Sequence, residues 1–221
     1  MSPQLPSAVS SSERFPQRRV AMLLFNDVEV LDFAGPFEVF GVATTAGGKA
    51  AFDVVTVALQ PGEVIARNGL RIIPSCTAED LGDIDILIVP GGFGTRRELQ
   101  NPAMLDFLRA ASGRSELTMS VCTGSLLLSA AGLLEGLAAT THRAAMDELR
   151  ALNSGAEILP HARIVDNGAL ITAAGISAGI DAALYVVSRL LGEVRARATA
   201  HYMQYDWRRC VDGETVVRVS A

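Results

Sequence analysis

Cys122 is the residue whose type and position are best suited to chemistry. It stands between an apolar and β-branched run, residues 117–121, and an apolar stretch of helical spacing, residues 125–131. Ser120 and Gly124, two positions before and after it, are small, as in the sharp strand-to-helix turn that presents a nucleophile. Because the N–H groups at a helix N-terminus favour a thiolate, we expect a lowered pKa for this thiol. The pattern predicts nucleophilic catalysis by cysteine.

Cysteine can also pack as a small hydrophobic residue, and this is the commoner role of an arbitrary cysteine. Cys76, in a segment expected to be a loop, and Cys210, near the C-terminus, lack the elbow context and are assigned that role. Three cysteines at these spacings match neither a disulfide framework nor a zinc site, so no metal is expected. This cysteine usage favours a reducing cytoplasm.

Two other polar segments follow predicted strands. Asp32 comes after the apolar run 19–25, and it could either cap the helix expected after it or act as a functional carboxylate. Gly91, Gly92 and Phe93 follow another strongly apolar run. Glycines in this place let backbone N–H groups face an anion or a developing oxyanion, although such a turn is a weak signal alone.

Two further segments could complete a site. His142 ends a short predicted strand; a histidine in that position is more often structural, so we keep it only as a candidate site residue. Gly175 and Ile176 lie in a turn rich in small residues before a long apolar helix that runs through Leu191. Small residues there would let backbone approach the thiol closely. His161 and His201 have no acidic or cysteine neighbours at useful spacing.

The elements that would position these residues alternate between strands and helices. Strands are predicted over 19–25, 52–59, 85–90, 117–121 and 138–141, hairpins over 64–73 and 163–172, and helices after Asp32, after Thr77, from 101, from 125, up to 191 and over 193–207. Such alternation predicts an α/β fold with a doubly wound, mainly parallel sheet, in which the carboxyl ends of neighbouring strands share one crevice. Asp32, the glycine turn and Cys122 can therefore converge there.

Composition limits the function classes. The chain has 221 residues, 49% of them hydrophobic, which suits one domain with short hairpin insertions. We expect a flexible leader over 1–18 without a signal peptide, the domain over 19–208 and a tail over 209–221. A formal charge of −5 without a basic stripe argues against nucleic acid as a partner, and no apolar run approaches the ~20 residues of a membrane span.

The motifs taken together resemble the DJ-1/PfpI superfamily, over roughly residues 19–192. The resemblance rests on segments 31–36, 89–92, 120–125, 131–134, 139–142 and 172–181. It is specific to the branch that contains isocyanide hydratases and the amino-terminal domains of AraC-type regulators. It implies a flavodoxin-like fold of the class I glutamine amidotransferase type, no cofactor and a homodimer.

The resemblance also implies roles for individual residues. The family's nucleophile falls on Cys122, its acid on Asp32 and a hydrogen-bonding threonine on Thr123. The branch with peptidase or deglycase claims commonly carries histidine at the position of Thr123, so proteolysis is not expected. Arg143 stands where isocyanide hydratases commonly have tryptophan.

The resemblance implies hydration of a small isocyanide to an N-formamide through a covalent thioimidate. In this reading Cys122 attacks and Asp32 moves the protons, while Thr123 and N–H groups near Gly92 and Ile176 hold the thiolate and the substrate. One alternative is a ligand-sensing or redox-sensing domain without turnover, against which the length argues because a regulator would need a DNA-binding segment. Another is a glyoxalase-type hydratase that uses Cys122 on a small carbonyl compound.

Overall fold

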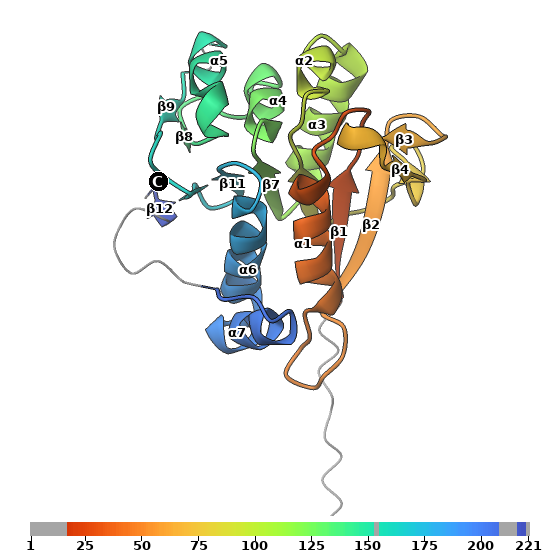
Figure 1. Cartoon of the computed structure of the whole chain (residues 1–221), viewed down its shortest axis with the longest axis vertical. Helices are drawn as coiled ribbons and strands as arrows, with labels where there is room; N and C mark the ends of the chain where they lie inside the picture. Colours follow the sequence, from red (N-terminus) through yellow and green to blue (C-terminus); the bar gives the residue numbers. More distant parts are fainter. Residues whose placement is uncertain (1–16, 153–154, 208–215, 220–221) are drawn as a thin grey trace, which may run out of the picture.

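A central eight-stranded sheet, covered by helices on both faces, organises the chain (Figure 1). The structure is a computed structural model that describes residues 17–152, 155–207 and 216–219. The strand order is β12-β10-β11-β7-β6-β1-β2-β5, and every neighbouring pair is parallel except β10 and β11. This is the predicted α/β fold with a mainly parallel, doubly wound sheet.

The elements occur in the following order. The strands of the large sheet are β1 (Arg18–Leu23), β2 (Phe52–Ala58), β5 (Cys76–Thr77), β6 (Ile86–Val89), β7 (Leu117–Val121), β10 (Ile164–Asp166), β11 (Leu170–Ala173) and β12 (Val216–Arg218). Two small sheets pair β3 (Val64–Ile65) with β4 (Arg71–Ile72), and β8 (Ala138–Ala139) with β9 (Glu157–Ile158). The α-helices are α1 (Val30–Val42), α2 (Thr95–Glu98), α3 (Pro102–Arg114), α4 (Gly124–Ala130), α5 (Met146–Ala151), α6 (Ala178–Leu191) and α7 (Glu193–Tyr202), and the 3-10 turns are η1 (Arg67–Gly69) and η2 (Arg143–Ala145).

The hydrophobic core has two halves because side chains alternate across each strand. Val20 and Met22 of β1 face the half that contains α1, α6 and α7. Ala21 and Leu23 face the half that contains α3 and α4. The central strand β6 is buried on both faces, which explains why its sequence is a continuous apolar run.

Most predicted elements are confirmed within a residue or two. The elbow strand occupies 117–121 as predicted, and both predicted hairpins form, as β3–β4 and as β10–β11. The long helix expected to run through Leu191 is α6.

Several predictions about elements are wrong. Thr77 lies in β5, where its hydroxyl donates to Asp80 in a turn, and Cys76 lies in the same strand instead of a loop. The strand predicted over 138–141 ends at 139, before His142, and α7 ends at Tyr202 instead of reaching 207. The predicted domain boundary at 208 omits β12, which pairs with β10 at the sheet edge. The leader up to residue 16 and Cys210 lie outside the described residues.

The sheet order brings the functional segments together. Strands β7, β6 and β1 are adjacent and parallel, so their carboxyl ends open on one crevice. The segments that follow them carry Cys122, Gly91 and Asp32 respectively. In the described part of the chain no helix is long and apolar enough to cross a membrane.

Candidate active site

Cys122 occupies a strained turn between β7 and α4. Its φ of 56° is in the left-handed region that residues with a side chain rarely adopt. The hydroxyls of Thr141 and Ser125 both donate to its carbonyl oxygen, at 3.0 and 3.2 Å. Gly124 approaches the Val89 backbone so closely that a Cβ would overlap the Val89 carbonyl oxygen. These contacts hold the elbow that the small residues predicted.

Two backbone N–H groups face the Cys122 sulfur, those of Thr123 and Ile176. Ile176 is itself in the left-handed region, with a φ of 53°, and this conformation aims its N–H at the thiol. The Cys122 N–H donates to the carbonyls of Ala173 and Ala174, both at 3.1 Å, so the two turns are joined directly. The structure places the Ile176 N–H against the Cys122 sulfur, and its part in holding a substrate stays a prediction.

Arg163 ties the Ile176 turn from both ends. Its carbonyl accepts from Ala174 N–H at 2.8 Å, just before the turn. Its guanidinium donates to Ser177 Oγ at 3.3 Å and to Asp181 Oδ2 at 2.6 Å, just after the turn. Arg163 thus positions the N–H that reaches the thiol, without contacting the thiol itself in any interaction that the structure records.

Asp32 lies beneath the pocket and is completely buried. It belongs to the first turn of α1, whose N-cap is Glu29, so the prediction that Asp32 caps this helix is wrong. Its Oδ2 accepts from Gly91 N–H at 3.0 Å, and its carboxyl faces the Cys122 thiol closely enough for a hydrogen bond. Oδ1 is buried and has no hydrogen-bond partner that meets the distance and angle limits among the described residues. Among the described residues no cationic side chain forms an ion pair with this carboxyl.

Burial changes the acidity of both groups. It raises the pKa of the Asp32 carboxyl from 3.8 to about 7, against the hydrogen bond from Gly91. Burial and, after it, the neighbouring Asp32 charge raise the pKa of the Cys122 thiol from 9.0 to about 12. The expectation of a lowered thiol pKa is wrong, because desolvation and Asp32 outweigh the N–H groups of Thr123 and Ile176. Near neutral pH the pair therefore holds one to two protons and resists losing both.

The glycine turn after β6 serves the site differently from the prediction. Gly91 N–H donates to Asp32, and Gly92 N–H donates to Thr123 Oγ1 at 2.9 Å, so neither donor is directed at a substrate. A Cβ on Gly91 would lie 2.5 Å from both the backbone N and the Oγ1 of Thr123. Glycine is needed because Asp32 and Thr123 approach this backbone closely. The expected oxyanion cradle at 91–92 is corrected to a scaffold that fixes Asp32 and Thr123.

A cavity of about 220 Å³ opens over the thiol. Six of the predicted site residues line it: Gly92, Phe93, Cys122, Thr123, His142 and Ile176. Gly91 and Asp32 lie behind this wall, and Gly175 packs against the His142 ring. Sequence reasoning missed the five other lining residues, Glu29, Arg67, Arg96, Ala144 and Ala145. Arg67 falls within the hairpin predicted over 64–73, a pattern that carries no signal for a cavity residue.

His142 has a structural role in addition to lining the cavity. Its Nδ1 accepts a hydrogen bond from Ala144 N–H at 3.2 Å and so caps the 3-10 turn η2. No interaction recorded for the described residues joins its imidazole to Asp32 or to Cys122. The structure therefore gives His142 a capping role and a place in the cavity wall, and does not form a Cys-His dyad with it.

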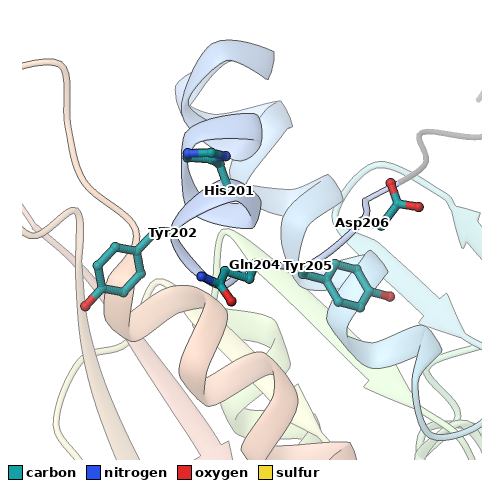
Figure 2. Close-up of a pocket in the computed structure, with 5 residues that line it drawn as sticks. All are labelled: His201, Tyr202, Gln204, Tyr205 and Asp206. Carbon is teal, nitrogen blue, oxygen red and sulfur yellow. The ribbon is translucent and has the colours of Figure 1, made fainter.

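A second hollow, of about 550 Å³, lies where α7 ends (Figure 2). It is lined by His201, Tyr202, Gln204, Tyr205 and Asp206, and shares no residue with the Cys122 cavity. Tyr205 donates to Asp181 Oδ1 at 2.9 Å, so this side chain helps to fix the Arg163–Asp181 pair. None of its lining residues is a cysteine, and the elbow nucleophile lies in the other cavity. Across the described ranges no group of His, Cys, Asp and Glu side chains is arranged to hold a metal ion.

Comparison with known proteins gives consistent matches. A family model described as DJ-1/PfpI family matches residues 18–189. Isonitrile hydratase of Pseudomonas putida is 37% identical over 187 residues, which cover 85% of this chain and 78% of that protein. The transcriptional regulator GbdR of Pseudomonas aeruginosa is 25% identical over 90% of this chain, but the match covers only 53% of GbdR.

Solved structures of related proteins also superpose on this chain. A ThiJ/PfpI family protein from Pseudomonas syringae superposes with a TM-score of 0.79 at 30% identity, over 96% of this chain and 85% of that one. Drosophila melanogaster DJ-1beta superposes with a TM-score of 0.76 at 19% identity, over 87% of this chain and all of that one. The second likeness concerns the fold alone.

Proposed function

We propose that this chain, which belongs to the DJ-1/PfpI family, is a cysteine-dependent hydratase that converts an isocyanide to an N-formamide. Isonitrile is another word for isocyanide, and the 37% identity to isonitrile hydratase supports this reaction. The observation that carries the proposal is the contact between Cys122 and a buried carboxyl that has no cation beside it. A carboxyl with a pKa of about 7 can both accept and deliver a proton near neutral pH.

The first half of the reaction uses the proton that the pair already holds. Asp32 accepts the thiol proton as the Cys122 sulfur forms a bond with the terminal carbon of the isocyanide. The protonated Asp32 then delivers the proton to that carbon, which gives the thioimidate R–N=CH–S. The N–H groups of Thr123 and Ile176 stabilise negative charge on sulfur before the bond forms. The Asp32 carboxyl returns to its ionised state.

The second half adds water. Asp32 takes a proton from the water as the water oxygen attacks the thioimidate carbon. Asp32 then passes this proton to the substrate nitrogen. The tetrahedral adduct R–NH–CH(OH)–S then collapses. A carbonyl forms, the carbon–sulfur bond breaks, and the hydroxyl proton returns to the Cys122–Asp32 pair. The product is R–NH–CHO, and the sum of the steps is one isocyanide plus one water.

Turnover of p-nitrophenyl isocyanide, followed by absorbance and by identification of the formamide, tests the proposal. We expect turnover by the native protein and none by Cys122→Ala. A trapped thioimidate on Cys122 would appear in intact mass as the protein plus one substrate. Absence of turnover, with Cys122 still alkylated at pH 8, would overturn the hydratase proposal. Turnover of methylglyoxal instead would move the reaction to a small carbonyl compound.

A second candidate is a sensing domain without turnover, supported by the match of most of this chain to about half of GbdR. Such a domain would bind a ligand in the same cavity and leave it unchanged. Ligand-dependent thermal stabilisation without product would support the sensor and contradict the hydratase. The uncompensated Asp32 favours the enzyme, because a binding pocket has no need of a buried acid that destabilises the fold.

A further inference from the structure

The mouth of the Cys122 cavity carries charged side chains that isocyanide hydration does not use. Glu29, Arg67 and Arg96 line the cavity together with the thiol. Neither guanidinium has a recorded interaction with the Cys122 sulfur or with Asp32, so neither acts on the reacting atoms. They are instead placed where they can contact the part of a substrate that does not react.

The two arginines differ in how fully their donors are used. Arg96 donates twice to Glu148, at 2.9 and 2.6 Å, and also to Gly92 O and Thr95 Oγ1, both at 3.2 Å. Arg67 has one side-chain hydrogen bond among the described residues, to Glu29 Oε2 at 2.9 Å. A guanidinium has five N–H donors, so Arg67 keeps donors for a ligand while Arg96 is occupied as a brace.

Arg67 is also held in a fixed place. Its guanidinium lies over the Phe93 ring, 4.2 Å from the centroid, and its backbone N–H donates to Val28 O at 2.9 Å. Its side chain is 41% exposed, whereas the Glu29 side chain is 16% exposed. A stacked, half-exposed guanidinium with free donors is suited to bidentate binding of a carboxylate.

We propose that the substrate carries a carboxylate, which Arg67 binds at the cavity mouth while the isocyanide carbon reaches Cys122. The identification of the reacting group rests on the proposed function, but the anion site does not. The cavity volume of about 220 Å³ is below the ~300 Å³ at which pockets for drug-sized ligands begin, so the substrate is small. Glu29 pairs with Arg67 and Glu148 pairs with Arg96, so the case for an anion rests on the donors of Arg67 that no described residue uses.

The anion site can be tested without any isocyanide. Iodoacetate and iodoacetamide differ in charge but hardly in size, and both alkylate thiolates. The ratio of their rates at Cys122, measured on the Cys122 peptide by mass spectrometry, reports binding of a carboxylate at the mouth. We expect the iodoacetate-to-iodoacetamide ratio to fall about tenfold in Arg67→Met. Arg71→Met is the matched control, because Arg71 is on the same hairpin, pairs with Glu63 and does not line the cavity.

The substrate class is tested in parallel with isocyanoacetate and its methyl ester. We expect the native enzyme to prefer isocyanoacetate in kcat/KM, and Arg67→Met to lose this preference through KM. Suppose that isocyanoacetate and its methyl ester both turn over, but Arg67→Met changes neither the alkylation ratio nor the acid-to-ester ratio of kcat/KM. The carboxylate proposal is then overturned and the hydratase stands. If neither isocyanide reacts while the alkylation ratio still depends on Arg67, the anion site stands and the hydratase is overturned.

Discussion

Two buried aspartates occupy opposite kinds of surroundings. Asp166, at the sheet edge, accepts hydrogen bonds from Tyr185 OH at 2.5 Å, Arg189 at 2.8 Å and Gly168 N–H at 2.8 Å. Asp32, in the crevice, has one backbone donor and the thiol of Cys122, and no arginine. Both side chains are removed from water, at 6% and 0% exposure.

The difference separates a structural carboxylate from a reactive one. Arg218 of β12 donates to Tyr185 OH at 2.8 Å, so the Asp166 cluster fastens the last described strand to the sheet. A charge that is paired and hydrogen-bonded is inert. A carboxyl that is buried without a cation keeps its proton to a higher pH and can exchange it with a neighbour, as the pKa of about 7 for Asp32 indicates.

The largest expected effect is on activity. Asp32→Asn keeps the shape and the acceptor for Gly91 N–H but cannot carry a proton. We expect kcat/KM for the isocyanide to fall by roughly 10²- to 10⁴-fold, the usual contribution of general acid–base catalysis. Asp166→Asn should leave kcat/KM within about threefold of the native value, because Asp166 does not line the Cys122 cavity. Comparable losses in the two variants would abolish the distinction between the aspartates.

The next effect is the pH dependence of stability. The pKa of Asp32 in the folded protein is raised above 3.8. The stabilisation that the protonated carboxyl gives the fold is therefore fully present below about pH 4 and is lost as the pH rises through about 7. Asp32→Asn should therefore raise the free energy of unfolding at pH 8 by up to roughly 4 kcal/mol and change it little at pH 4. Urea unfolding at both pH values measures this. An equal loss of stability at both would contradict a buried, uncompensated carboxylate.

Asp166→Asn should lower the free energy of unfolding at pH 8, where Asp32→Asn raises it. It leaves Arg189, and the Tyr185–Arg218 contact, without their anion, and we expect a loss of about 3 kcal/mol at pH 8. Hydrogen exchange should locate the loss in β10 and β12. An unchanged stability would show that the cluster does not hold the sheet edge.

The smallest effect concerns the Ile176 N–H. Arg163→Met releases the contacts to Ser177 and Asp181, and we expect alkylation of Cys122 by iodoacetamide at pH 8 to slow about fivefold. Arg163→Lys should recover part of the rate because it keeps the charge for Asp181. Arg109→Met, on the exposed face of α3, is the control. A slowed rate that lysine does not improve would contradict a positioning role.

The sequence predicted the elbow because its signal is local. A β-branched strand, small residues at 120 and 124 and a helical repeat are all within fifteen positions, and the structure has β7 and α4 there. The same reasoning placed Asp32 at the crevice, and in the structure its carboxyl faces the Cys122 thiol.

The rest depends on distances that no local pattern contains. The predicted direction of the Cys122 pKa shift was wrong, because the burial of the thiol and the approach of Asp32 are set by the packing of β1, β6 and β7. Arg67 and Glu29 were missed because a hairpin and a loop 38 residues apart meet only in the fold. Strand β12 was missed because it has three residues and joins the sheet through the Asp166 cluster.

The central claim, that Cys122 and Asp32 share a proton, is tested most directly by the pH profile of Cys122 alkylation. Iodoacetamide rates are measured between pH 5.5 and 10 for the native protein and for Asp32→Asn, on the Cys122 peptide. We predict that the native rate rises with a midpoint near 7, where Asp32 becomes able to accept the thiol proton. Asp32→Asn should lose that step and titrate once, at a thiol pKa below the native value of about 12. Identical profiles for the two proteins would contradict the shared proton.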